Sequence, residues 1–184
     1  MASPVDRLPE RLEGEEGLLL LRWRPGDAEE MAEAVAESAE DLRPWMHWMA
    51  DEPLSMEARR ELIRGWEEDW KRGGDVHMAI VFGGGIAGGA GLSHRQGPGI
   101  LEIGYWVRSG CQGRGLATRA SRLLAAAALA VPGIEHVEIR PNKANERSGR
   151  IPARLGFTLA GEAPSQFDVP AGTGIDCVWR LSRR

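Results

Sequence analysis

The chain has 184 residues and a mass of 20.1 kDa, with 42% hydrophobic and 27% charged residues, so it is expected to form one ordinary globular domain with a real core. The net charge is −4, and no run of basic residues with interspersed aromatic residues is present, which argues against nucleic-acid binding. The sequence has neither an apolar run long enough to span a membrane nor a signal peptide. Two cysteines and four histidines without ligand spacing predict no disulfide framework and no metal site, so we expect a cytoplasmic protein.

The first 75 residues predict a tail, one strand and two helices. We expect a flexible N-terminal tail at residues 1–16 and a single domain over residues 17–184. The elements expected up to residue 75 are a strand at 17–24, a helix at 26–38, a loop or bent helix carrying two tryptophans at 40–53, and a helix at 55–72.

The rest of the chain predicts a sheet and two more helices. The expected strands are 76–82, 86–94, 100–108, 134–141, 157–163 and 175–181, and the expected helices are 116–130 and about 145–155. This order, β-α-α-β-β-β-α-β-α-β-β, is typical of one mixed α/β sheet with helices packed on it.

Charge and aromatic residues are unevenly distributed. Residues 1–75 carry a charge balance of −10 and residues 76–184 a balance of +6. A basic half can attract a polyanionic small molecule and an acidic half a cationic one, although scattered charges that only solvate helix faces explain the same pattern. The chain also has seven tryptophans against a single tyrosine, Tyr105.

Two glycine-rich loops invite different interpretations. Residues 83–88 fit the G-x-G-x-x-G pattern of a dinucleotide-binding loop, but that loop requires a helix directly after the glycines, and the segment here is too rich in glycine to form one. We therefore predict a tight hairpin and an accidental match.

The second loop, at residues 109–115, runs from a strand into a long helix. Gly113 and Gly115 let an anion approach the backbone, the amides of residues 113–118 are free donors of a helix N-terminus, and Arg114 adds a cation. This pattern suits a pyrophosphate, and it is not a Walker loop because no G-K-[ST] is present.

These residues resemble a known family. The segment Gln112-Gly113-Arg114-Gly115-Leu116-Ala117 is similar to the Q/R-x-x-G-x-G/A motif of the GCN5-related N-acetyltransferase (GNAT) superfamily. Three further segments resemble its ribosomal-protein (RimJ/RimL-like) branch: Leu42–Trp48, Glu102–Val107, and the block from Asn142 to Ser148 that ends in Leu155-Gly156-Phe157. The resemblance runs in order from about residue 17 to residue 182.

The resemblance implies a GNAT fold, which is a single mixed, mostly antiparallel sheet of six to seven strands with about four helices. It also implies acetyl transfer from acetyl-CoA to a primary amine, by direct attack in a ternary complex. The acceptor is a protein N-terminal α-amine or a small-molecule amine, and a homodimer is compatible with the branch. A non-catalytic acyl-CoA sensor or interaction module on the same fold is the main alternative, and a nucleotide-phosphate-binding protein is a more distant one.

The resemblance also implies which residues hold acetyl-CoA. The pyrophosphate is assigned to Gln112, Gly113, Arg114, Gly115, Leu116, Ala117 and Thr118, and the pantetheine arm to Trp106 and Val107. Asn145 matches an asparagine that contacts the pantetheine, and it also has the residue type of a helix N-cap.

Two residues are candidates for catalysis. Glu102 shares one strand face with Gly104 and Trp106, and the resemblance makes it the base, acting through a water. An exposed carboxylate, or one paired with an arginine, is the alternative. The resemblance makes Ser148 the candidate acid. The alternative is a serine in the first turn of a helix whose hydroxyl hydrogen-bonds to nearby backbone. The superfamily's usual tyrosine acid is excluded, because no tyrosine follows the asparagine block.

The resemblance also implies that the acceptor site lies at Trp45 and Trp48, which flank His47 between the first two helices. Tryptophans provide apolar and cation–π walls for a cationic amine. Plain core packing of an i, i+3 pair is the alternative, and no metal ligand is expected.

Overall fold

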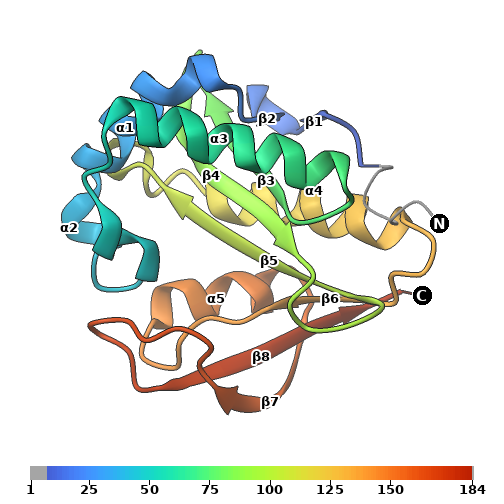
Figure 1. Cartoon of the computed structure of the whole chain (residues 1–184). Helices are drawn as coiled ribbons and strands as arrows, with labels where there is room; N and C mark the ends of the chain where they lie inside the picture. Colours follow the sequence, from blue (N-terminus) through green and yellow to red (C-terminus); the bar gives the residue numbers. More distant parts are fainter. Residues whose placement is uncertain (1–7, 184) are drawn as a thin grey trace.

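The computed structural model describes residues 8–183 and shows one mixed sheet with helices on both faces (Figure 1). Within these residues the sheet has eight strands in the order β1-β2-β3-β4-β5-β6-β8-β7. The strands are β1 (Arg11–Glu13), β2 (Leu19–Arg22), β3 (Val76–Phe82), β4 (Gly85–Ser93), β5 (Ile100–Val107), β6 (His136–Ile139), β7 (Thr158–Pro164) and β8 (Ile175–Ser182). Every neighbouring pair is antiparallel except β5 and β6, which are parallel.

The described part of the chain also forms five α-helices and four 3₁₀ turns. The helices are α1 (Ala28–Glu37), α2 (Ala39–Leu42), α3 (Met56–Lys71), α4 (Leu116–Ala130) and α5 (Glu146–Arg154). The 3₁₀ turns are η2 (Glu15–Gly17), η3 (Pro25–Asp27), η4 (His47–Asp51) and η5 (Ser109–Cys111).

The expected counts of six to seven strands and about four helices are therefore too low. The additional strand, β1, lies within the stretch expected to be a tail, where Arg11 pairs with Leu21 of β2 and Leu8 is buried. The strand Arg11–Glu13 has a single hydrophobic residue between two charged ones, which is too short a pattern to predict a strand from the sequence. The additional helix, α2, is one short turn within the segment expected to bend, and residues 1–7 of the expected tail lie outside the described residues.

Each face of the sheet has its own hydrophobic core. On one face, Met78 and Ile80 of β3 belong to the cluster that includes Leu124 of α4, and α5 lies on the same side. On the other face, Ala79 belongs to the cluster that includes Met31 of α1 and Ile63 of α3. The alternation along β3 thus separates the two helix layers, as the period of two in a strand requires.

The two central strands separate after a short contact. Strands β5 and β6 pair only from Ile100↔His136 to Glu102↔Glu138, whereas β4 stays paired with β5 as far as Val107. Within the described chain, residues 103–107 therefore have a strand neighbour on one side only. Their backbone N–H and C=O groups on the β6 side face a gap, and unpaired backbone groups of this kind favour a ligand or water.

The first glycine loop is a hairpin, as expected from its sequence. Gly83 and Gly84 form the two-residue turn between β3 and β4, with φ values of 65° and 85°. Positive φ at both central residues is the requirement of a type I′ hairpin turn, and no helix follows. The match to the dinucleotide-binding pattern is therefore accidental.

Glycine at position 89 makes room for a tryptophan. Gly89 of β4 lies opposite Trp106 of β5, and a Cβ added at Gly89 would lie 2.4 Å from the indole Nε1. The indole thus crosses directly over the β4 backbone. The glycine content of β4 lets the large side chains of β5 lie close to the sheet on this face.

We predict that Gly89→Ala lowers the free energy of unfolding by about 1–3 kcal/mol, because Trp106 must move to admit the new methyl group. The control is Gly65→Ala, since Gly65 lies on α3 with nothing within 4 Å of an added Cβ. That substitution should stabilise by about 0.5–1 kcal/mol. Urea unfolding measures both, and equal effects would contradict the close contact.

Candidate functional site

The residues expected to form the site meet at the C-terminal half of β5. Ile103, Tyr105 and Val107 point toward the α4 layer, where they join its hydrophobic cluster. Trp106 joins the cluster of the α1 and α3 layer, and the alternation of a strand places Glu102 on that same face. Strand β5 therefore presents one set of side chains to each side of the gap that opens beside β6.

The loop after β5 forms a cradle of free backbone donors. Gly113 and Gly115 have φ values of 76° and 69°, and Gly115 is the N-cap of α4. Among residues 8–183, the amides of residues 113–118 have no hydrogen-bond acceptor. A Cβ added at either glycine would meet nothing within 4 Å, so the cradle is open. A helix N-terminus of this kind attracts an anion through both its N–H groups and its dipole.

Gln112 links three segments with its side chain. Its amide nitrogen donates to the Asp41 carboxylate at 3.0 Å, and its amide oxygen accepts from Arg147 at 2.7 Å. Ser109 donates to the same Asp41 carboxylate. The side chain of Gln112 therefore holds the cradle to α2 and α5, while Arg147 brings a cation that the sequence analysis did not identify.

Glu102 lies in a confined polar environment. Its side chain is only 14% exposed, Gln96 Nε2 donates to Glu102 Oε2 at 2.5 Å, and Arg95 Nε lies 3.8 Å from the same oxygen. Burial raises the pKa of the Glu102 carboxyl above its ordinary value, and this effect exceeds the opposing effects of Arg95 and Gln96. The carboxylate is therefore a better proton acceptor than an exposed glutamate.

The space above the neighbouring glycine is open. Gly104 lies between Glu102 and Trp106 on the same strand face, and a Cβ there would meet nothing within 4 Å. A small group can thus enter between the carboxylate and the indole. Sequence reasoning placed these three residues on one face but did not identify the opening.

A buried ion cluster fixes the strand beside Glu102. Glu138 of β6 is fully buried, pairs in register with Glu102, and accepts hydrogen bonds from Arg140 Nε at 2.8 Å and Arg180 Nη2 at 2.6 Å. Because both carboxylate oxygens are used, the charge is compensated in the interior. The cluster ties β6 to β8. The charge of Arg140 also opposes the rise in the pKa of Glu102, without cancelling it.

Ser148 and Asn145 lie at the start of α5. Asn145 is the N-cap of this helix, and its side-chain oxygen accepts a hydrogen bond from Ser148 N at 3.1 Å. The side-chain oxygen of Asn145 is therefore used in capping the helix. The Ser148 hydroxyl lies 2.8 Å from the hydroxyl of Tyr105. The sequence correctly excluded a tyrosine after the asparagine block, but it did not reveal that the chain's one tyrosine meets Ser148 across 43 residues.

The two tryptophans expected at the acceptor site have different surroundings. Trp48 packs edge to face against Trp106, with ring centroids 6.1 Å apart, and lies beside the α1 and α3 core. The structure therefore brings Trp48 next to the face that carries Glu102. Trp45 is partly exposed and shares no ring contact with either tryptophan.

Two loops close over this face through an aromatic pair that the sequence did not suggest. The rings of His47 in η4 and Phe167 in the β7–β8 loop stack with centroids 3.8 Å apart, and Arg95 lies 5.1 Å from the centre of Phe167. The amide of Ala171 also donates to Pro44 O at 3.1 Å. Burial, with help from Arg95, lowers the pKa of His47, which favours the uncharged imidazole.

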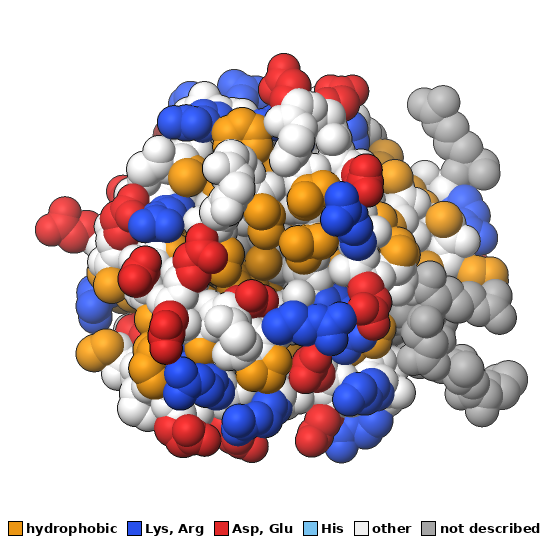
Figure 2. Space-filling view, turned by 90° about the horizontal axis from the view of Figure 1, so that it is seen from above, with side chains coloured by type: hydrophobic (Ala, Val, Ile, Leu, Met, Phe, Trp, Pro, Cys, Tyr) orange, Lys and Arg blue, Asp and Glu red, His pale blue; other side chains and the backbone are white. Residues whose placement is uncertain are grey.

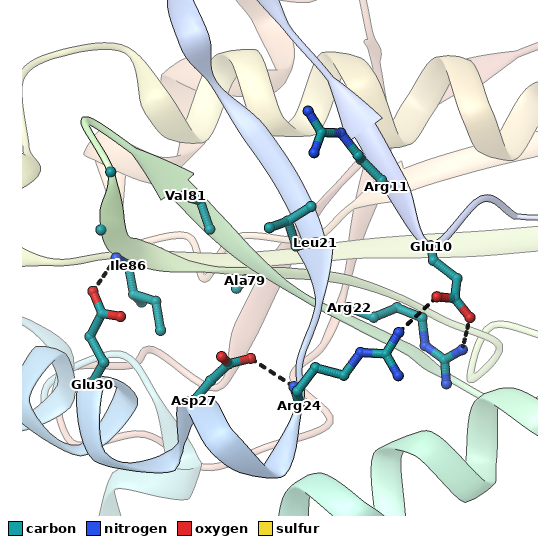
Figure 3. Close-up of a pocket in the computed structure, with 12 residues that line it drawn as sticks. Glu10, Arg11, Leu21, Arg22, Arg24, Asp27, Glu30, Ala79, Val81 and Ile86 are labelled. Carbon is teal, nitrogen blue, oxygen red and sulfur yellow. Dashed lines mark hydrogen bonds and ion pairs between the residues drawn. The ribbon is translucent and has the colours of Figure 1, made fainter.

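A separate hollow lies across strands β2, β3 and β4, and none of the candidate site residues lines it (Figure 3). Its charged groups bind one another: Glu10 pairs with Arg22 at 2.9 Å and with Arg24 at 2.7 Å. Glu30 accepts from the Ile86 amide at 2.6 Å, beside an apolar floor of Leu21, Ala79 and Val81. Because its carboxylates already have partners, we place the site at β5 instead.

The face seen in Figure 2 carries positive and negative side chains interspersed around a central group of hydrophobic ones. The charge imbalance between the two halves of the sequence therefore does not form a single-sign surface on this face. Residues 8–183 contain no helix that is long and apolar enough to cross a membrane, and no group of three or more metal-ligating side chains.

Glu102 should make stability depend on pH. Its pKa is raised in the folded state, so its contribution to stability is present at low pH and is lost as the pH rises through that folded-state pKa. We predict that Glu102→Gln is more stable than the natural protein at neutral pH, and that this advantage disappears in acid. Urea unfolding at several pH values measures it.

Glu135→Gln is the control for this prediction, because Glu135 is exposed and should change the free energy of unfolding by less than about 0.5 kcal/mol at any pH. A Glu102→Gln variant that is less stable at neutral pH would show that the Gln96 and Arg95 contacts outweigh burial.

Comparisons with known proteins identify the family of the chain. The family model described as acetyltransferase (GNAT) domain matches residues 17–158. The chain is 30% identical over 141 residues, 76% of each chain, to the "Putative ribosomal N-acetyltransferase YdaF" of Bacillus subtilis (strain 168).

Solved structures show the same fold. RimL, a ribosomal alpha-N-protein acetyltransferase in complex with coenzyme A, aligns with a TM-score of 0.84 at 18% identity, over 94% of this chain and 98% of that one. The self immunity acetyltransferase MccE in complex with acetyl-CoA and AMP aligns with a TM-score of 0.84 at 20% identity, over 97% and 99%. Together with the family match, these findings show that the chain belongs to the GNAT family and is an acetyl-CoA-dependent N-acetyltransferase.

Proposed function

We propose that this acetyltransferase acts on the N-terminal α-amine of a protein, with Glu102 as base and Ser148 as acid. The observation that carries the proposal is the position of β5 beside the gap. Glu102 and the open space at Gly104 lie on one face of this strand, and the Tyr105–Ser148 contact lies on the other. A donor and an acceptor can thus approach the strand from opposite sides.

The residues present fit acetyl-CoA. The free amides of residues 113–118 suit its pyrophosphate. Arg114 lies within this loop, and Arg147 hydrogen-bonds to Gln112 beside it, so both can add positive charge. The backbone of Val107 faces the gap and suits the amides of the pantetheine arm, whereas the backbone of Trp106 faces β4. The side-chain nitrogen of Asn145 is a further donor. Acetyl-CoA supplies an activated thioester, and the chain's own residues supply orientation and proton transfer.

Glu102 is suited to removing a proton from an ammonium group. Its raised pKa brings it closer to that of an amine, and Gln96 and Arg95 hold the carboxylate in place. The acceptor amine enters at the open space of Gly104, beside Glu102. Its proton passes to the Glu102 carboxylate through a water. The lowered pKa of His47 at the rim disfavours a positive charge that would repel a cationic acceptor.

Ser148 is suited to the leaving sulfur. Its hydroxyl lies at the first turn of α5, on the side of β5 where Val107 borders the gap. It hydrogen-bonds the departing thiolate and relays a proton to it from solvent. The first turn of a helix also favours a negative charge.

A protein acceptor is favoured over a small molecule by the relatives. Their printed names describe a ribosomal N-acetyltransferase and a ribosomal alpha-N-protein acetyltransferase. A flexible N-terminal peptide can enter between the segment 45–48 and the β7–β8 loop, with Trp48 and Phe167 as apolar walls. This assignment implies a cytoplasmic location, where ribosomal proteins are available. The non-catalytic acyl-CoA sensor gains no support from these matches.

The test is a thiol-release screen with acetyl-CoA against N-terminal peptides of ribosomal proteins and a panel of small amines. We expect turnover with one or more peptides, and mass spectrometry should place the acetyl group on the α-amine. With that peptide, Glu102→Gln should lower kcat and remove the rise in rate with pH. Turnover restricted to small amines would overturn the protein acceptor, and an unchanged pH profile would remove Glu102 as base.

The pyrophosphate assignment predicts a charge effect at Gly115. Gly115→Asp and Gly115→Asn have the same shape, and both residue types tolerate the left-handed backbone there. We expect Asp to weaken acetyl-CoA binding about tenfold more than Asn, because only Asp repels the phosphates. Isothermal titration calorimetry measures both, and equal affinities would show that the phosphates bind elsewhere.

A further inference from the structure

The only tyrosine of the chain contacts the proposed acid. Tyr105 lies on β5 with its ring in the core beneath α4, and its hydroxyl lies 2.8 Å from Ser148 Oγ. In a buried setting of this kind a phenol needs a partner, and the Ser148 side chain provides it. The contact joins β5 to the first turn of α5, across the gap between the strands.

A proline in α5 strengthens this connection. Pro152 follows Ser148 by four residues and has no N–H, so the Ser148 carbonyl loses its usual helical donor. The Tyr105 hydroxyl lies 3.4 Å from that carbonyl oxygen. The phenol therefore faces both oxygen atoms of Ser148. The carbonyl oxygen can only accept a hydrogen bond, and the hydroxyl oxygen accepts from the phenol when its own O–H points elsewhere.

We infer that Tyr105 is a positioning residue, which donates to Ser148 Oγ and thereby leaves the serine O–H free to point at the sulfur of the acyl donor. A serine at the start of a helix otherwise turns its hydroxyl toward nearby backbone carbonyls. The inference rests on the acid role proposed for Ser148. No proton leaves Tyr105 in this arrangement.

The protonation state of Tyr105 is consistent with a permanent donor. Burial raises the pKa of Tyr105 to about 12, although the hydrogen bond with Ser148 acts in the opposite direction. The phenol thus keeps its proton throughout the pH range in which the protein is assayed. Its hydrogen bond to Oγ also polarises the serine, which strengthens the bond that Ser148 donates in turn.

The test compares Tyr105→Phe, Ser148→Ala and the double variant, and its first readout needs no acceptor. Free coenzyme A is bound to each protein, and the ultraviolet absorbance of its thiolate is followed against pH. We expect Tyr105→Phe to reduce the ionisation constant of the bound thiol about three- to tenfold, which is the effect of one lost hydrogen bond. In the Ser148→Ala background the same change should have no effect.

A second readout uses the peptide acceptor found by the screen. Tyr105→Phe should lower kcat by a similar factor and leave the dissociation constant of acetyl-CoA unchanged, and the loss should vanish when Ser148 is already alanine. A merely structural tyrosine would act equally in both backgrounds. Urea unfolding of each variant checks that the fold is retained.

The outcomes separate the two proposals. If Ser148→Ala changes the thiol titration and kcat but Tyr105→Phe does not, the positioning role is overturned and the acid role stands. If Tyr105→Phe acts equally with and without Ser148, the positioning role is also overturned. If Ser148→Ala itself changes neither quantity, the acid role fails and the inference fails with it.

Discussion

Strands β5 and β6 run parallel for only three residue pairs, and the gap that follows is the constraint on which the site depends. The contact itself is fixed from the β6 side, because Glu138 is buried and held by Arg140 and Arg180. On the other side β4 stays paired to the end of β5, so β5 does not follow β6 when the two diverge. A rigid strand with one unpaired edge is the result, and it ends at the amide cradle of α4.

The groups proposed for chemistry are placed where burial changes their properties. Glu102 is confined beside Gln96 and Arg95, and its pKa is raised. On the opposite face Tyr105 is kept protonated and meets Ser148. Such placement costs folding free energy, since the carboxylate is less solvated than in the unfolded chain. Active sites commonly retain this cost because a proton acceptor and a fixed hydroxyl are useful there.

Local pattern was sufficient wherever an element has a strong hydrophobic signal. The strand at 76–82 has the expected bounds, since its apolar run ends at the Gly83-Gly84 turn, and the helix at 116–130 also has the expected bounds. Strand β1 was missed because Arg11–Glu13 pairs only as an edge, with no apolar alternation of its own. The motif residues gave the family, which the match over residues 17–158 confirms.

The sequence by itself determined the family, the cradle loop and the identity of the candidate base and acid. Those features are local, since a helix N-cap, a turn or a motif depends on neighbouring residues. Only the tertiary structure decided which distant groups meet: Tyr105 with Ser148, His47 with Phe167, and Arg95 with Glu102. These contacts join different strands, helices and loops, so they depend on how the sheet and helices pack. For that reason, the sequence shows that no tyrosine follows the asparagine block, but it could not show that the one tyrosine lies against Ser148, the proposed acid.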